Sequence, residues 1–144
     1  MTLKAILTNK PAGFFSVPPE MRISGVIAML AEKRIGAVLV VKNQNELLGI
    51  LSERDVVRSL AAEATATLEL TAAQLMTPKP TTATPSTTVA EAMEIMTEGH
   101  FRHLPILEDG QLIGLVSIGD VVKARIDQTV HEVESLRTYV GGNV

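Results

Sequence analysis

Two Ser-x-x-Asp pairs carry the side chains of this sequence best suited to binding chemistry. Ser52 and Asp55 form the first pair, and Ser117 and Asp120 form the second. A strand-to-helix turn leaves backbone N–H groups free at the helix N-terminus, where they can bind an anion such as a phosphate. An ionised Asp only accepts hydrogen bonds, so it suits the two hydroxyl groups of a ribose. A phosphate at the turn with a ribose on the Asp would make a nucleotide-shaped site.

The same pairs also have a plainer structural interpretation. Ser at the N-cap with an acidic residue three positions later is close to a capping box, which satisfies the free N–H groups of the helix itself. Negative charge also suits the positive end of a helix. Either pair taken singly fits a cap better than a binding site, whereas recurrence at the same point of two repeats favours binding. Both interpretations stay open.

The two pairs lie in two copies of one sequence unit. Five of ten positions are identical between residues 49–58 and residues 114–123. Each copy has a Gly-led apolar strand, the Ser-x-x-Asp turn and an apolar helical run. The equivalence extends upstream, because Ile23 and Val89 begin the same helical apolar spacing 66 positions apart. The repeat indicates a chain built by doubling one unit.

Apolar patterning predicts the element order β-α-β-β-α in the first unit. A short strand is expected at residues 14–17, followed by a helix with one apolar face from Ile23 to Leu30. The continuous apolar run at residues 36–41 indicates a strand buried on both faces. A return strand at residues 47–51 would pair with it antiparallel across a polar turn.

The second unit repeats this order. Its first strand is expected at residues 81–84, and its central strands at residues 104–107 and 112–116. Thr88 and Glu91 predict a capping box at the start of the helix between them. The first copy lacks an equivalent cap.

A long helix is expected from Asp120 to about Tyr139, ended by Gly141 and Gly142. Its extra turns need a surface to pack against, and either the chain's own domain or a partner chain would serve. The apolar stripe that requires this packing consists of Ile126, Val130, Val133, Leu136 and Val140.

Composition limits the class of protein. The chain has 144 residues, of which 46% are hydrophobic and 20% charged, as in a globular protein with a core. A net charge of −3 without a long basic run disfavours nucleic-acid binding. The absence of Cys excludes disulfides and thiol catalysis. The start shows no signal-peptide pattern, and no apolar run approaches the ~18 residues of a membrane span. We therefore expect a cytoplasmic protein with no membrane partner.

The repeats resemble a tandem pair of cystathionine-β-synthase (CBS) domains, known as a Bateman module. The resemblance covers about residues 14–126. It implies an α/β (α+β) fold in which two pseudo-symmetric β-α-β-β-α repeats pack through their sheets, with a C-terminal helix extension. The carrying motifs are Gly-h-h-Ser-x-x-Asp-h-h at 49–57 and 114–122, Met76-Thr77-Pro78, and the segment 102–106. The implied division is a lead-in at 1–13, repeats at 14–70 and 71–126, and the extension at 127–144.

The resemblance also implies an adenine nucleotide or related adenosyl ligand in the cleft between the repeats. AMP is the expected ligand, with ATP, ADP, NADH and S-adenosylmethionine as alternatives. Asp55 and Asp120 would hold ribose hydroxyls, with Ser52 and Ser117 nearby. The remaining expected site residues lie on the strands near the adenine, with their backbone toward it: Ser16, Val17, Ala37, Val38, Thr82, Thr84, His103, Leu104 and Pro105.

The two copies differ at the expected phosphate end. The first has Arg54 between its Ser and Asp, where the second has Gly119. The second supplies Arg102 and His103 inside the segment that carries the resemblance. We predict that Arg54, Arg102 and His103 bind phosphate; for the two Arg side chains, a solvated surface position is the alternative.

Three functional hypotheses follow. The first is a non-catalytic sensor in which a bound nucleotide biases the module's shape or partner surface. Its output would pass to a separate effector protein, and the resemblance implies a homodimer. The second is a structural or dimerising module whose Ser/Asp pairs are only caps. An enzyme is disfavoured because no general base has a recognisable setting, and a metal site at His100 and His103 is disfavoured because Arg102 would repel a cation.

Overall fold

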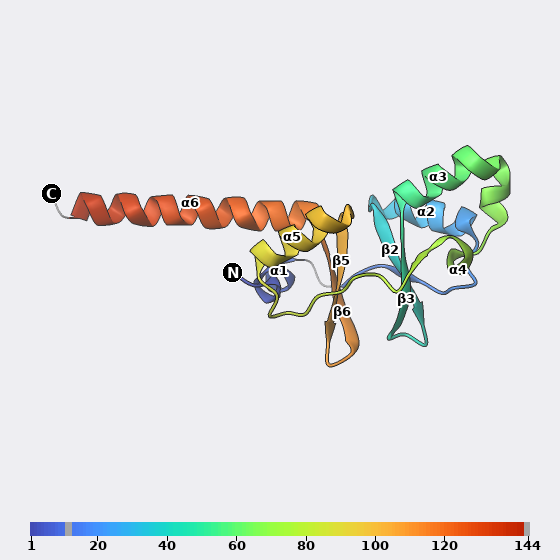
Figure 1. The fold of residues 1–144 in the computed structure, drawn as a ribbon, viewed down its shortest axis with the longest axis horizontal. Coiled ribbons are helices and arrows are strands. Elements are labelled where there is room, and N and C mark those ends of the chain that lie inside the picture. The colour runs from blue at the N-terminus through green and yellow to red at the C-terminus, as the bar shows by residue number, and fades with distance from the viewer. Residues whose placement is uncertain (11–12, 143–144) are drawn as a thin grey trace.

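The computed structural model describes residues 1–10 and 13–142. Figure 1 shows two β-hairpins side by side, with helices on their outer faces and one long helix leaving the body. The predicted fold, two pseudo-symmetric repeats packed through their sheets with a C-terminal helix extension, is confirmed. Pro11 and Ala12, which belong to the predicted break after the lead-in, lie outside the described residues, as do Asn143 and Val144.

The first repeat forms a four-stranded sheet in the order β1-β2-β3-β4. Strand β1 pairs parallel to β2, and the other neighbours pair antiparallel. The predicted strand at 14–17 is shorter than expected, and the linker contributes a strand that the patterning did not predict. The strands are β1 (Ser16–Val17), β2 (Ala37–Lys42), β3 (Glu46–Ser52) and β4 (Thr77–Pro78).

Helices cover one face of this sheet. The predicted apolar face is confirmed, because Ile23, Val26 and Leu30 are buried. The first of these helices has Arg22 at its N-cap position and no side-chain cap, as its sequence predicts. The helices are α2 (Ile23–Lys33), α3 (Glu53–Glu63), the 3₁₀ helix η1 (Ala64–Glu69) and the short α4 (Ala72–Leu75), which is capped by Thr71.

The second repeat has one strand fewer than predicted. Residues 81–84 make only an isolated parallel bridge, between Ala83 and Ile106. Pairing stops there because the next backbone N–H, that of Thr84, donates to the Thr87 side chain within a turn. The elements of this repeat are α5 (Val89–Gly99), β5 (His103–Glu108), β6 (Gln111–Ser117) and α6 (Ile118–Gly142).

The predicted capping box of α5 forms only in part. The Thr88 hydroxyl accepts from the backbone N–H of Glu91 at 3.0 Å, but the return bond from the Glu91 side chain is not among the described contacts. The backbone of Thr88 instead pairs with Thr2 in an antiparallel bridge. The bonds of this bridge run from the Leu3 N–H to the Thr87 carbonyl and from the Val89 N–H to the Met1 carbonyl, so they tie the chain start to the beginning of α5.

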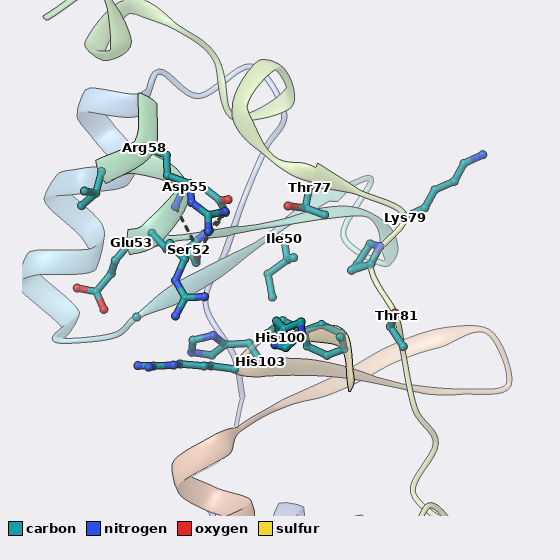
Figure 2. A pocket seen from close by; sticks show the side chains of 17 residues that line it. Ile50, Ser52, Glu53, Asp55, Arg58, Thr77, Lys79, Thr81, His100 and His103 are labelled. Atoms are coloured by element: carbon teal, nitrogen blue, oxygen red, sulfur yellow. Dashed lines mark hydrogen bonds between the residues drawn. The ribbon is translucent and has the colours of Figure 1, made fainter. Parts of the chain in front are cut away.

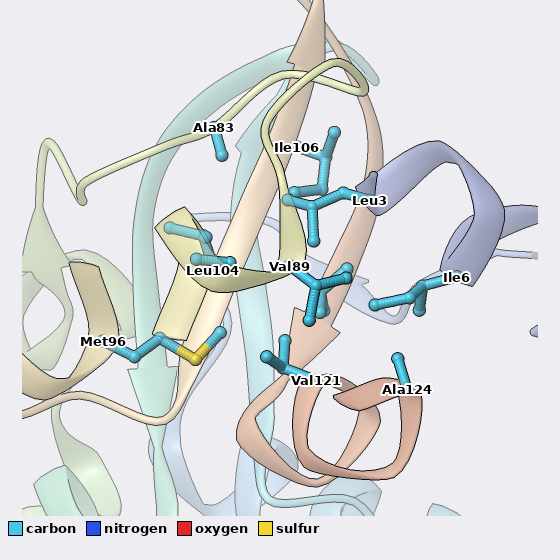
Figure 3. Packing of buried hydrophobic residues seen from close by; sticks show 11 residues of the cluster. Leu3, Ile6, Ala83, Val89, Met96, Leu104, Ile106, Val121 and Ala124 are labelled. Atoms are coloured by element: carbon cyan, nitrogen blue, oxygen red, sulfur yellow. The ribbon is translucent and has the colours of Figure 1, made fainter. Parts of the chain in front are cut away.

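The lead-in forms a helix, α1 (Leu3–Asn9), that belongs to the core of the second repeat. Figure 3 shows Leu3 and Ile6 pointing from α1 toward Val89, Val121 and Ala124. Leu3 is fully buried. The second repeat therefore completes its core with residues from the opposite end of the chain.

The two repeats meet through their hairpins. Leu39 and Val41 of β2 pack with Leu112 and Leu115 of β6, and all four side chains are buried. Strand β2 thus has helices on one side and the second hairpin on the other. This arrangement explains its continuous apolar sequence and confirms the predicted burial on both faces.

The glycine that opens each repeat signature lies beneath a crossing segment. A Cβ on Gly49 would lie 2.5 Å from Met76 Sδ and 2.7 Å from the Thr77 carbonyl oxygen. A Cβ on Gly114 would meet the flexible tip of Leu7 at 2.6 Å. The linker crosses the first glycine and the lead-in helix crosses the second.

Replacing Gly49 by Ala should therefore destabilise the fold more than replacing Gly114 by Ala. The first change pushes against backbone and should cost about 1–3 kcal/mol, whereas Leu7 can rotate away from the second. Urea unfolding of the two variants checks this difference. Equal losses in the free energy of unfolding would contradict this prediction, because they would mean that the linker backbone moves aside as easily as the Leu7 side chain.

The predicted long helix is confirmed as α6, which runs slightly past Tyr139 to Gly142, the last residue that the structure describes. After Gln128 its side chains are exposed as far as Val140. Across residues 1–10 and 13–142, none of the helices combines the length and apolar character that a bilayer crossing requires.

Candidate functional site

A cleft of about 780 Å³ lies between the first repeat and the start of the second hairpin. Figure 2 shows Ser52 and Asp55 on one wall, with His100 and His103 on the facing wall. The linker between the repeats, at Thr77, Lys79 and Thr81, runs along a third side. The cleft is therefore lined by the N-terminus of α3 in the first repeat, by the linker, and by residues just before and at the start of β5 in the second repeat.

Asp55 performs the capping role that the plainer interpretation predicts. The Ser52 backbone N–H and hydroxyl both donate to Asp55 Oδ2, at 2.8 and 3.0 Å. The Asp55 N–H donates to Ser52 Oγ at 3.4 Å, which completes a capping box. These bonds use Oδ2, so the carboxylate stays oriented in the cleft lining while Oδ1 takes part in none of them. Capping and ligand binding are thus compatible at this residue.

The cleft has an excess of positive charge. Arg54 and Arg58 come from α3, Lys79 from the linker and Arg102 from the start of β5. Only Glu53 and Asp55 oppose them among the residues that line the cleft. The three residues predicted to bind phosphate, Arg54, Arg102 and His103, are brought together here. A phosphorylated ligand suits this balance of charge.

The second Ser/Asp pair lies outside the lining of this cleft. The Ser117 N–H donates to Asp120 Oδ2 at 2.9 Å, and the Asp120 N–H donates to Ser117 Oγ at 3.1 Å. The same Oδ2 accepts from Lys10 Nζ at 2.8 Å, and Lys10 also donates to the Leu115 carbonyl at 2.7 Å. Asp120 Oδ2 therefore accepts from both Ser117 and the Lys10 ammonium group, whereas Oδ1 takes part in neither bond.

The Lys10 contact also governs the charge of Asp120. Burial raises the pKa of this carboxyl, but the hydrogen bonds from Lys10 and Ser117 and the charge of Lys10 more than offset burial. The pKa of Asp120 is therefore below its ordinary value. Asp120 is therefore held as a carboxylate that is already paired with Lys10 through Oδ2.

The remaining predicted residues lie outside the lining of the cleft. Ser16 and Thr84 are exposed, and Thr82 is half-buried. Thr84 hydrogen-bonds within a turn to Ser86 and Thr87. The others have buried side chains on the strands, so that only their backbone could face a ligand: Val17, Ala37, Val38, Leu104 and Pro105.

Several lining residues were not predicted. Thr77, Lys79 and Thr81 belong to the linker, where Met76-Thr77-Pro78 was the available signal. Arg58 lies one helical turn after Arg54, a spacing that places both on one side of α3. The other unpredicted residues are Gly36, Ile50, Glu53, Val57, Pro80, Gly99, His100 and Phe101.

His103 is partly buried and is influenced by charged side chains of both signs. Burial lowers its pKa, and the positive charges of Lys10 and Arg102 lower it as well. The negative charges of Glu53 and Asp120 oppose this shift without reversing it. His103 is therefore neutral at neutral pH.

Because the pKa of His103 is lower in the folded protein than in the unfolded chain, acid should weaken the fold. The contribution of neutral His103 to the free energy of unfolding is complete above about pH 6.5. It is lost as the pH falls through the pKa of His103 in the folded protein. Replacing His103 by Gln should flatten the change in Tm between about pH 7.5 and 5.5. The exposed His131, replaced by Gln, provides the control and should keep the wild-type slope. An unchanged slope in the His103 variant would contradict this account.

In the two described ranges, no three His, Asp or Glu side chains come close enough together to hold a metal ion. The arrangement instead offers cations and hydrogen-bond acceptors to an organic anion.

The CBS domain family matches residues 3–62 and 72–127, and the chain therefore belongs to the CBS-domain family. Members of this family are generally regulatory modules. The match covers both repeats and begins at residue 3 in the lead-in helix. The sequence motifs alone predict a first repeat that begins only at about residue 14.

Known proteins share this architecture. The chain is 36% identical over 120 residues to "CBS domain-containing protein CBSX3, mitochondrial" of Arabidopsis thaliana, covering 81% of this chain but only 58% of that protein. The crystal structure of the CBS-domain containing protein ATU1752 from Agrobacterium tumefaciens has a TM-score of 0.84 at 38% identity, over 87% of this chain and 99% of that one.

A second similar structure contains a nucleotide. The CBS domain protein PAE2072 from Pyrobaculum aerophilum, complexed with AMP, has a TM-score of 0.74 at 27% identity. The match covers 83% of this chain and 89% of that one.

Proposed function

We propose that this module is a non-catalytic sensor that binds an adenine nucleotide in the cleft beside Asp55. AMP is the expected ligand, with ATP, ADP, NADH and S-adenosylmethionine as alternatives. The AMP complex of the similar Pyrobaculum aerophilum protein supports this ligand class. The cleft, at about 780 Å³, falls within the range of about 300–1,000 Å³ typical of small-molecule sites.

The observation that carries the proposal is one acidic acceptor among several cations in one cleft. Asp55 accepts the ribose hydroxyls, while Arg54 and Arg102 lie on the same cleft for the phosphate. His103 lines the same cleft as these two Arg side chains. The ligand thus touches α3 of the first repeat and β5 of the second, which gives it a means of biasing the relation between the repeats.

The proposed stoichiometry is one nucleotide per chain. Lys10 occupies Asp120 in the second repeat, and Gly119 stands where the first repeat has Arg54. In the second repeat a ligand would therefore compete with Lys10 for Asp120, and it would lack the counterpart of Arg54.

The regulatory output is proposed to act through a homodimer on a separate effector protein. A ligand shifts such an equilibrium only through different affinities for two states of the module. The alternative is a structural or dimerising module whose Ser/Asp pairs serve only as caps, an arrangement that the capping box at Ser52 and Asp55 favours.

Calorimetric titration of the whole chain with AMP, ADP, ATP, NADH, S-adenosylmethionine and adenosine tests the proposal. The expected result is saturable binding with a stoichiometry near one, and tighter binding of AMP than of adenosine, since adenosine lacks the phosphate. No heat and no rise in Tm with any of them at millimolar concentration would favour the structural alternative. Loss of nucleotide on long incubation, followed by chromatography, would contradict the non-catalytic assignment.

A further inference from the structure

The second half of α6 extends away from the rest of the protein. Figure 1 shows this helix running past α1 and α5 into open space. Every side chain from Thr129 to Val140 is exposed, including large apolar ones such as Val133 at 45% and Leu136 at 64%. An isolated helix of this length is marginal in water, and β-branched residues lower its intrinsic helix propensity. The exposed segment therefore needs a partner surface.

Most of the apolar residues of this segment follow a seven-residue repeat, with Val130 and Tyr139 beside it. Ile126, Val133 and Val140 are spaced by seven and take the a positions of a heptad. Thr129 and Leu136 then take the d positions. Sustained a and d spacing defines the seam of a coiled coil, and within parallel coiled coils β-branched residues at a with Leu at d favour two strands.

We propose that the segment from Ile126 to Val140 pairs with the same segment of a second copy of this chain in a parallel two-stranded coiled coil. The partner is identified by self-complementarity. In a parallel pair a g position meets the e position of the next heptad on the partner helix. Here g is Glu132 and the following e is Arg137, so each dimer gains two pairs of opposite charge.

An antiparallel pair would not make these charge contacts, because g then faces g and e faces e. Glu132 and Arg137 would lie opposite other residues. The charge pattern therefore selects the parallel orientation. This orientation places the two nucleotide-binding bodies at the same end of the coiled coil, joined at the start of α6.

Sedimentation of the whole chain over a range of concentrations tests the association. Replacing Leu136 by Asp puts a charge in the seam and should raise the dimer dissociation constant at least tenfold. Thr138 lies at an outer f position, so its replacement by Asp is the matched control and should leave the dimer intact. Unchanged Tm values in both variants would show that the body stays folded.

Cysteine cross-linking tests the orientation, because the natural chain has no Cys. In a parallel pair, identical a positions lie side by side. Ile126→Cys and Val140→Cys should therefore each form a disulfide-linked dimer under mild oxidation. Thr138→Cys, on the outer face, should stay monomeric in a denaturing gel.

The outcomes separate this inference from its alternatives. A wild-type chain that sediments as a monomer at all concentrations overturns it, as does a dimer that Leu136→Asp leaves unchanged. Cross-linking only between an Ile126→Cys chain and a Val140→Cys chain would show antiparallel pairing and also overturn it. None of these results depends on nucleotide, so nucleotide binding keeps its own test, whereas a monomer at all concentrations would also contradict the homodimer of the proposed function.

Discussion

Replacing Asp55 by Asn should weaken AMP binding roughly 10- to 100-fold. The Asn side chain keeps the shape of Asp and one acceptor oxygen, so the bond from the Ser52 N–H can persist. It loses the negative charge and replaces an acceptor with a donor, which removes a charged hydrogen bond to the ribose. Such bonds contribute about 1.5–3 kcal/mol. Calorimetric titration of the variant with AMP measures the loss.

The matched control is Asp120→Asn. Asp120 is the counterpart of Asp55 in the second repeat, but its Oδ2 is paired with the Lys10 ammonium group. This change should therefore leave AMP affinity within about twofold, a difference of about 0.4 kcal/mol. If Asp120→Asn instead weakens binding as much as Asp55→Asn, the ligand uses both carboxylates and the assignment of a single open site is wrong.

Replacing Leu3 by Ala should destabilise the protein by about 2–5 kcal/mol, although Leu3 lies outside the repeat pattern. The side chain is fully buried among Val89, Ala92 and other core residues of the second repeat. Truncation removes its packing and leaves a cavity. For a domain of this size the expected drop in Tm is roughly 5–15 °C.

Lys4→Ala on the same helix is the control for Leu3→Ala. Lys4 is exposed, so its truncation should change Tm by only about 1–2 °C. Calorimetric melting of both variants gives the comparison. Similar small changes would mean that α1 is loosely attached and that the second repeat folds without it.

Local patterns predict the repeats because the responsible forces act over short distances in the sequence. The apolar run of β2 reflects burial on two faces, and the face of α2 reflects contact with one sheet. The alternation of strand, turn and helix around Ser52 is equally local. Capping and binding could not be separated by sequence, because the same Ser and Asp spacing serves both.

The remaining features depend on contacts between distant parts of the chain. Lys10 and Asp120 are 110 positions apart, and neither has a neighbouring signal that predicts their pairing. The lead-in helix is covered by the second repeat rather than the first, so its role depends on how the halves assemble. Linker residues such as Lys79 line the cleft only because the linker crosses beside β3.

A crystal structure of the protein grown with AMP tests the central claim most directly. We predict one AMP per chain in the cleft, with ribose hydroxyls bonded to Asp55 and the phosphate near Arg54 and Arg102, while Lys10 still contacts Asp120. An AMP molecule bound at Asp120 with Lys10 displaced, or a cleft left empty at saturating AMP, would contradict it.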